Sequence, residues 1–381
     1  MFDYIEWRGD LTFVQSPFNP VDNIIFSQLA YIPLDGIVPG PDEKKDLSLS
    51  LAAGQFAKKL RESPEAYRNL LISGEDPDFI KALGSAARYQ SCRLSAYVNH
   101  IDILAEKQFS ALCIKLGDNT AYLAFRGTDS SLVGWKEDLN MSFSRTVPSQ
   151  IEAVSYLESI AKKIRGGLRL GGHSKGGNLA VYAASFCKKR IRPRIIEIYS
   201  NDAPGFHQSV ITSKGYQAVK DRILTFIPQS SVIGMLFEHD GSYTVVESSQ
   251  KGLMQHNLYS WKLRRNDLVR LDRVTRGSRF IDKTLREWID GLDYKQRQQF
   301  IEAVYTIFSA TEALSIQELS ADWLKNSFLV IQTLTNTDDQ TKEMIGKVLA
   351  SLLRAAKNNI KALLPKRGKN ITTQSAVFVV P

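Results

Sequence analysis

The pattern of apolar and polar positions divides the 381-residue chain into three parts. Up to about residue 100, apolar residues recur at helical spacing, most clearly over 49–60 and 79–94. Between about 107 and 246, short apolar runs alternate with amphipathic stretches, and from about 282 only helical patterns remain. We therefore expect a helical N-terminal segment joined to a central core and followed by a helical extension, over 1–100, 101–280 and 281–381.

The central part predicts strands that alternate with helices. Two runs, 109–116 and 122–125, predict a hairpin that turns through Gly117-Asp118-Asn119. Alternation of strands and helices over about 150 residues is typical of an α/β fold. The further strands are expected at 168–170, 195–199, 223–227 and 243–246, and the helices at 149–165 and 178–189.

The last part predicts four helices, of which the final one is the most regular. They are expected at 282–292, 294–312, 316–334 and 338–364. One face of the final helix is apolar and the opposite face is basic. This helix either packs on its neighbours or lies on an anionic membrane. The apolar face carries Ile345, Val348, Leu349, Leu352, Leu353, Ile360, Leu363 and Leu364, and the basic face carries Lys347, Arg354, Lys357 and Lys361.

Composition excludes several classes of protein. With 43% apolar and 23% charged residues the chain is not disordered, and no uninterrupted apolar run reaches the length of a membrane span. The N-terminus carries acids where a secretory signal would be basic. Three widely spaced cysteines, Cys92, Cys113 and Cys187, indicate reduced thiols and neither disulfides nor a metal site. We expect a cytoplasmic protein.

Most of the net charge of +9 lies near the C-terminus. Residues 341–370 hold eight basic residues and one acid, so they account for about +7. The basicity therefore does not favour nucleic-acid binding by the whole chain. It belongs instead to the final helix, where peripheral contact with an anionic membrane is the alternative to simple packing.

A glycine-rich turn carries the clearest candidate chemistry. Gly172-His173-Ser174-Lys175-Gly176 matches G-x-S-x-G, a nucleophile elbow in which Ser174 lies between a strand and a helix. Larger side chains at the two glycines would collide with neighbouring backbone. The alternatives are a purely structural turn, or a phosphate loop, which the lack of a following G-K-[ST] disfavours. The His173 ring should point away from the serine and shape the turn.

An elbow serine needs a base, and the chain order of such hydrolases is serine, acid, histidine. His100 precedes the sheet, and His207 follows the elbow too closely. His256 follows the strand at 243–246 and a polar loop, which is the expected place. His239 and a structural role for His256 stay as alternatives.

The acid and the oxyanion hole are less sharply defined. Asp202 follows the strand at 195–199, but it could equally cap a helix before Phe206. Asp240 and Glu238 are the other candidate acids. For the oxyanion we expect the N–H of Lys175 together with Thr128, which lies in a turn after a strand, although that turn could also be a plain one.

The motifs resemble the class 3 (fungal-type triglyceride) lipases. Their F-R-G-T turn supplies an oxyanion donor, and their G-H-S-x-G elbow supplies the nucleophile. The resemblance covers roughly residues 1–265 and is closest to an Mbeg-like bacterial branch, largely of unknown function. It is carried by Phe125-Arg126-Gly127-Thr128-Asp129, Trp135, Asp138-Leu139 and 172–177, and for the branch by Trp7-Arg8-Gly9-Asp10-Leu11, 201–206, 228–236 and Gln255-His256.

One departure from that family concerns the acid. Class 3 lipases carry it in a D-x-V-P segment after the next strand, where this chain has Ser231-Val232-Ile233-Gly234. The acid has therefore either moved to Asp202, one strand earlier, or been lost.

Two functions follow from these observations. The first is a serine hydrolase on an α/β-hydrolase-type sheet that cleaves a small acyl or lipid ester with no metal or organic cofactor. The second is a degenerate hydrolase fold that binds lipid or protein.

Overall fold

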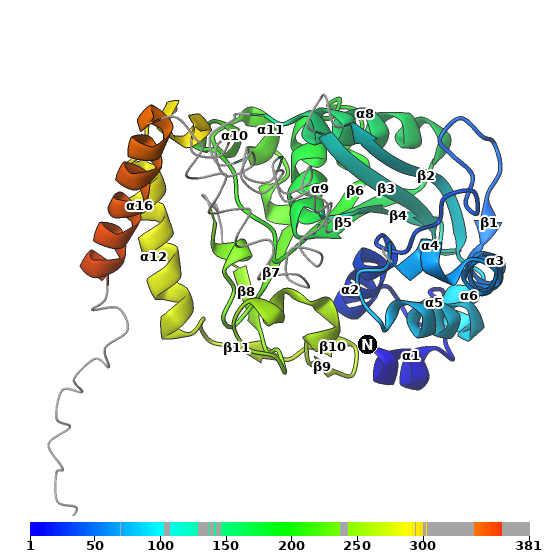
Figure 1. Ribbon diagram of the computed structural model, residues 1–381. Coiled ribbons are helices and arrows are strands. Elements are labelled where there is room, and N and C mark those ends of the chain that lie inside the picture. The colour runs from blue at the N-terminus through cyan, green and yellow to red at the C-terminus, as the bar shows by residue number, and fades with distance from the viewer. Residues whose placement is uncertain are drawn as a thin grey trace, which may run out of the picture.

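A twisted sheet with helices on both faces forms the centre of the molecule (Figure 1). The structure is a computed structural model that describes residues 1–68, 70–102, 107–128, 137, 141, 146–236, 243–293, 295–299, 302 and 339–359. Within these residues nine strands form one sheet in the order β1-β2-β3-β4-β5-β6-β7-β8-β11. Strands β4 to β8 are parallel, and the pairs on either side of them are antiparallel.

The strands and helices have the following bounds. The strands are β1 Leu47–Ser48, β2 Arg93–Asp102, β3 Lys107–Lys115, β4 Thr120–Phe125, β5 Gly167–His173, β6 Ile195–Asn201, β7 Ile223–Pro228, β8 Tyr243–Val246 and β11 Arg270–Leu271, with β9 Leu263–Arg264 and β10 Asp267–Leu268 as a separate pair. The helices are α1 Phe2–Arg8, α2 Pro20–Leu29, α3 Leu49–Glu62, α4 Pro64–Arg68, α5 Asp76–Ser85, α6 Ala87–Gln90, α8 Pro148–Lys163, α9 Lys175–Phe186, α10 Gln208–Ile211, α11 Lys214–Gln217, α12 Arg276–Asp290 and α16 Asp339–Asn359.

Each face of the sheet has its own apolar core. Along β4, Tyr122 and Ala124 point to one core while Leu123 and Phe125 point to the other, as a period of two requires. The second core contains α8, α9, α10 and α11. Since right-handed crossovers between strands in sequential order place every connecting helix on the same face, the opposite face is left open. The mixed α/β sheet agrees with the prediction.

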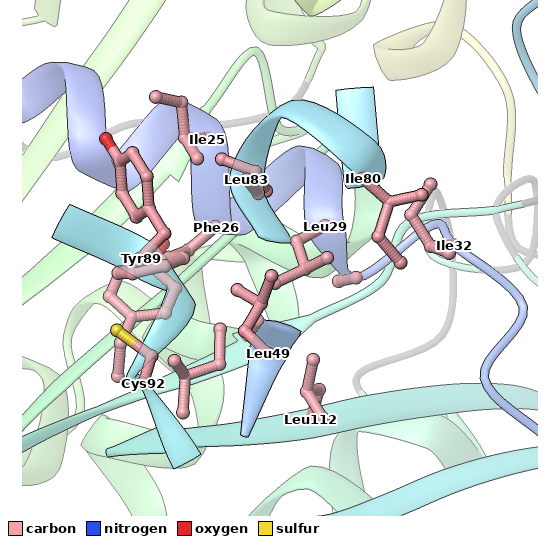
Figure 2. Close-up of a cluster of buried hydrophobic side chains, with 14 of the residues drawn as sticks. Ile25, Phe26, Leu29, Ile32, Leu49, Ile80, Leu83, Tyr89, Cys92 and Leu112 are labelled. Carbon is pink, nitrogen blue, oxygen red and sulfur yellow. The ribbon is translucent and has the colours of Figure 1, made fainter. Parts of the chain in front are cut away.

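The N-terminal helices cover that open face. Figure 2 shows Phe26 and Leu29 of α2 packed with Leu49 of α3, Leu83 of α5 and Leu112 of β3. All five side chains are fully buried or nearly so. The N-terminal segment is therefore one of the three layers of the fold, and burial of this apolar area contributes to its stability.

The segment 1–100, expected to be mostly helical, ends in a strand that the sequence pattern did not predict. Arg93–Asp102 forms β2, which pairs antiparallel with β3. A bulge between Ser95 and Val98, with Ala96 at φ 54°, interrupts the alternation that would have marked a strand. The helical pattern predicted over 79–94 corresponds to α5 and α6. The residues from Arg93 onward are extended because they pair with β3.

A buried ion pair fastens the N-terminal layer together. The Arg88 guanidinium donates two hydrogen bonds to Asp22, of 2.8 Å and 2.6 Å, and both side chains have no exposed area. Arg88 also donates to the carbonyls of Leu11, Ser16 and Pro17. The loop before α2 is thereby tied to α6, and the buried charges are compensated.

Helices α12 and α16 lie side by side at one end of the sheet (Figure 1). The indole N–H of Trp288 donates to the carbonyl of Val348 at 3.0 Å, and Ile345, Val348 and Ala355 are buried. Leu353, expected on the packed face, is 71% exposed because at about 100° per residue it lies away from this narrower stripe. Contact of α16 with an anionic membrane stays a prediction.

The remaining C-terminal predictions fall largely outside the described residues. Helix α12 begins six residues earlier than expected because the Thr275 side chain caps it. The patterns at 294–312 and 316–334 lie outside the described chain except for 295–299 and 302, which are helical. In the part that is described, no helix combines the length and apolarity needed to cross a bilayer.

Candidate active site

The candidate residues gather at the carboxyl ends of the parallel strands. Thr128 follows β4, Ser174 follows β5 and Asp202 follows β6, while His256 lies at the end of the 3₁₀-helix Gly252–His256. Because these strands are parallel neighbours, their ends meet at one edge of the sheet. Thr128, Ser174 and His256 line one cavity of about 240 Å³.

Ser174 occupies a strained turn between β5 and α9. Its backbone has φ 56° and ψ −134°, a left-handed conformation that costs a non-glycine residue about 1–3 kcal/mol. Its N–H donates to the carbonyl of Asn201 at 2.9 Å, which holds the turn against β6. A Cβ on Gly176 would lie 2.0 Å from the carbonyl oxygen of Phe125, so glycine is needed there, as expected from the motif.

The turn after β4 lies directly against the elbow. A Cβ on Gly127 would lie 2.2 Å from the Tyr31 hydroxyl and 3.0 Å from Cβ of Ser174. Only glycine therefore allows this backbone to approach the serine so closely. The approach brings the next residue, Thr128, to the cavity that Ser174 lines.

His256 and Asp202 are hydrogen-bonded to each other. The distance from Nδ1 of His256 to Oδ2 of Asp202 is 2.6 Å, and the carboxylate is buried while the imidazole is 28% exposed. A carboxylate only accepts, so Nδ1 carries a proton, and in the neutral ring Nε2 then has the lone pair. The histidine is thus oriented in the tautomer that a general base needs.

Asp202 is held by the segment where class 3 lipases carry their acid. Its Oδ1 accepts from the Ser231 hydroxyl at 2.5 Å and from the N–H of Gly234 at 3.1 Å. The alternative role for Asp202 as a helix cap is wrong, because the helix that follows begins at Gln208 and His207 caps it. Three donors therefore hold the two oxygens of the carboxylate in place.

Lys175 has a side-chain role that the sequence did not reveal. Its ammonium group lies 2.9 Å from Oε2 of Glu137, and both side chains are buried. Glu137 also accepts from the backbone N–H groups of Gln108 and Ser149. Glu137, 38 residues before Lys175 in the sequence, thereby ties the residue that follows the nucleophile to the start of α8.

The sequence predicts that the His173 ring points away from the serine, but the ring faces the same cavity as Ser174. The His173 ring lies 4.2 Å from the His256 ring, centroid to centroid. The Tyr31 hydroxyl lies 3.0 Å from Nδ1 of His173. Burial, and then the neighbouring His256 imidazole, lowers the pKa of His173 well below its ordinary value of 6.5.

The lowered pKa of His173 predicts a pH dependence of stability. The folded state favours the neutral ring, so this contribution is complete above pH ~6.5 and is lost as the pH falls below that value. The difference in free energy of unfolding between wild type and His173→Gln should therefore shrink below pH ~6.5, by at most about 1.4 kcal/mol per pH unit. Urea unfolding between pH 8 and 5 measures it. Parallel curves for wild type and His173→Gln would contradict the assignment.

A buried amide pair connects the N-terminal layer to the elbow. Asn23 of α2 and Asn201 of β6 donate to each other at 2.9 Å and 3.0 Å. Asn201 also donates to the carbonyl of Gly172 at 3.0 Å, and the Tyr122 hydroxyl donates to Asn23. Helix α2 thus braces the two strands that carry Ser174 and Asp202, a contact across 178 residues that no local pattern reveals.

Several predicted residues lie outside the described chain. They are the alternative base and acids, and part of the lipase-like motif after the F-R-G-T turn. Within the described ranges, no cluster of three or more potential metal ligands occurs. The residues outside are His239, Asp240, Glu238, Asp129, Trp135, Asp138 and Leu139.

The residues at this cavity are of the types that acyl transfer uses. Ser174 lies in a strained turn, His256 presents Nε2 with its Nδ1 fixed by a carboxylate, and Lys175 is the first residue of a helix whose N-terminal N–H groups favour an anion. No organic cofactor is needed for such a reaction.

The chain matches one family model and is similar to two solved structures. A family model described as Mbeg1-like matches residues 83–306, more than half of the chain. Among solved structures, M37 lipase is similar with a TM-score of 0.36 and 14% identity over 58% of this chain and 70% of that one. A deletion mutant of Rhizomucor miehei lipase in a propeptide complex has a TM-score of 0.34 and 15% identity over 53% and 69%. A comparison with curated proteins gave no match. The expected family is confirmed by the match of the family model: the chain belongs to the Mbeg1-like family.

Proposed function

We propose that the protein is a serine hydrolase that cleaves acyl esters. Oγ of Ser174 attacks the ester carbonyl, and Nε2 of His256 takes its proton. Asp202 holds the imidazole and stabilises its charged form. The N–H of Lys175 and Thr128 stabilise the oxyanion, and His256 returns the proton to the alcohol as the carbon–oxygen bond breaks.

A second half-reaction regenerates the serine. Water attacks the acyl group on Ser174, and His256 accepts a proton from that water. Collapse of the second tetrahedral intermediate releases the carboxylic acid and returns the proton to Oγ of Ser174. Atoms balance with water as the only co-reactant.

The observation that supports this proposal most directly is the hydrogen bond between His256 and Asp202. It joins two residues 54 positions apart, with the carboxylate buried, at the cavity that Ser174 lines. His256 and Ser174 line the same cavity, and backbone strain such as that of Ser174 at φ 56° clusters at functional sites.

Covalent labelling tests the proposal. A fluorophosphonate probe should label the wild type, and Ser174→Ala should abolish labelling because the probe needs the activated hydroxyl. The control is Ser155→Ala, a change at a serine on the exposed side of α8 that should label like wild type. Absence of wild-type labelling, or labelling that survives in Ser174→Ala, would favour the binding-module alternative instead.

A further inference from the structure

The ring of His173 packs against the proposed base. His173 is only 7% exposed and lines the cavity together with Ser174 and His256. The centroids of the two imidazoles lie 4.2 Å apart, with an angle of 41° between the ring planes. At this separation the rings are in van der Waals contact, so His173 occupies space into which His256 would otherwise turn.

The hydrogen bond with Asp202 does not fix the imidazole of His256 completely. It holds one atom, Nδ1, at 2.6 Å from Oδ2 of Asp202, and the His256 side chain is 28% exposed. A side chain held at one nitrogen can still swing, and Nε2 moves with it. A base must keep Nε2 within about 2.6–3.2 Å of the hydroxyl from which it takes a proton, so a small swing lowers the rate.

Tyr31 holds His173 in turn. Its hydroxyl lies 3.0 Å from Nδ1 of His173 and donates to the carbonyl oxygen of the same residue at 3.3 Å. A hydroxyl can donate one hydrogen bond and accept others, so both contacts can form together. Tyr31 is 5% exposed, and a Cβ on Gly127 would lie 2.2 Å from its hydroxyl. The tyrosine therefore contacts both the elbow and the turn after β4.

The charge state of His173 is compatible with a place beside the base. Burial, and then the His256 imidazole, lowers the pKa of His173 well below 6.5, so its ring is neutral at pH 7. His256 becomes positively charged when it takes the proton of Ser174. A neutral neighbour does not oppose that charge, whereas a second imidazolium at 4.2 Å would repel it.

We infer that Tyr31 and His173 are positioning residues of the proposed hydrolysis: Tyr31 fixes the ring of His173, and that ring limits how far the imidazole of His256 can turn away from Ser174. This inference rests on the proposed hydrolase function. It gives the N-terminal layer a part in the reaction, because Tyr31 lies just after the end of α2.

Kinetics of p-nitrophenyl butanoate hydrolysis test the inference. His173→Leu should lower kcat by about 10², as expected when a reacting group is misplaced by about 1 Å. Tyr31→Phe should lower kcat by about tenfold, for one lost hydrogen bond. KM should change little, because the proposed role concerns His256 and not the binding of the ester. His173→Phe keeps an aromatic ring beside His256 and should retain more of kcat than His173→Leu does.

A buried tyrosine elsewhere is the control for these substitutions. Tyr156 of α8 is also 5% exposed, and its hydroxyl donates to the carbonyl of Ala96 at 2.9 Å, but it is not among the residues that line the cavity. Tyr156→Phe should therefore keep the wild-type kcat. Wild-type kcat in both Tyr31→Phe and His173→Leu would overturn the inference.

A double-variant cycle separates an effect on His256 from damage to the rest of the site. In a His256→Ala background, Tyr31→Phe and His173→Leu should not lower the residual kcat any further, because the side chain on which they act is gone. A further loss of the same size in this background would mean that the two residues act on the elbow or on the turn after β4, and it would overturn the inference.

Proton NMR gives a readout that needs no catalysis. The Nδ1 proton of His256, hydrogen-bonded to Asp202, should give a downfield resonance that is absent in His256→Ala. Tyr31→Phe retains both imidazoles, so broadening or a shift of this resonance reports a change in their positions, and Tyr156→Phe should leave it unchanged. If the resonance responds to Tyr31→Phe while the wild type hydrolyses no ester, the positioning contact is supported and only the hydrolase proposal fails. An unchanged resonance in Tyr31→Phe sinks the inference alone.

Discussion

Replacing Asp202 by asparagine should lower kcat for ester hydrolysis by about 10⁴, the loss seen when a triad acid becomes an amide. Asp202 accepts from Nδ1 of His256 at 2.6 Å, and an asparagine amide in its place can donate instead. The imidazole would then carry its proton on Nε2, where it cannot take one from Ser174. Steady-state kinetics on p-nitrophenyl butanoate measure the loss.

A control substitution at an exposed aspartate distinguishes loss of the triad acid from a nonspecific effect of removing a carboxylate. Asp221 is exposed between α11 and β7, so Asp221→Asn should keep wild-type kcat. Circular dichroism establishes that Asp202→Asn is folded, and its rate of fluorophosphonate labelling should fall in parallel with kcat. A loss of less than tenfold would mean that another group orients His256 and that the acid had been assigned wrongly.

Breaking the ion pair between Lys175 and Glu137 should be the most destabilising change at the site. Both side chains are buried, so Lys175→Met leaves the Glu137 carboxylate without a counter-charge in a medium of low dielectric constant. The free energy of unfolding should fall by about 3–5 kcal/mol. Urea denaturation, followed by tryptophan fluorescence, measures it.

A double variant separates two contributions to the loss of stability, the unpaired buried charge and the lost packing around Lys175. Lys175→Met/Glu137→Gln removes both charges, while the glutamine oxygen can still accept from the N–H of Gln108 or Ser149. It should therefore be more stable than Lys175→Met. The exposed pair Lys58–Glu62 is the control, and Lys58→Met should change stability by less than about 1 kcal/mol. If the double variant is as unstable as Lys175→Met, the cost comes from packing around the lysine and not from the unpaired charge.

The sequence carried enough information for the fold class and for the place of the serine. The elbow could be predicted because the motif, the preceding strand and the following helix are all local, and the steric need for Gly176 follows from backbone geometry. His256 could be proposed from chain order alone. The acid stayed open among Asp202, Asp240 and Glu238, since chain order allows more than one strand end.

What the sequence did not reveal depends on contacts between distant segments or on exact backbone angles. The contacts of Glu137 with Lys175 and of Asn23 with Asn201 join separate layers, and neither follows a repeat or a spacing rule. The direction of the His173 ring depends on how the strand ends before the left-handed turn at Ser174. Strand β2 was missed because its bulge removes the alternation on which strand prediction depends.

The contact between Ser231 and Asp202 bears on how such sites diverge. The ends of β6 and β7 are neighbours, and the Ser231 hydroxyl after β7 contacts the same carboxylate that contacts Nδ1 of His256. A lineage can therefore transfer its acid from one strand to the next while the serine and the histidine stay where they are, provided that the vacated position keeps a hydrogen-bond donor for the newcomer. Some homologues lack the aspartate at one aligned position and therefore seem inactive. In these, the end of the neighbouring strand should also be searched for a carboxylate.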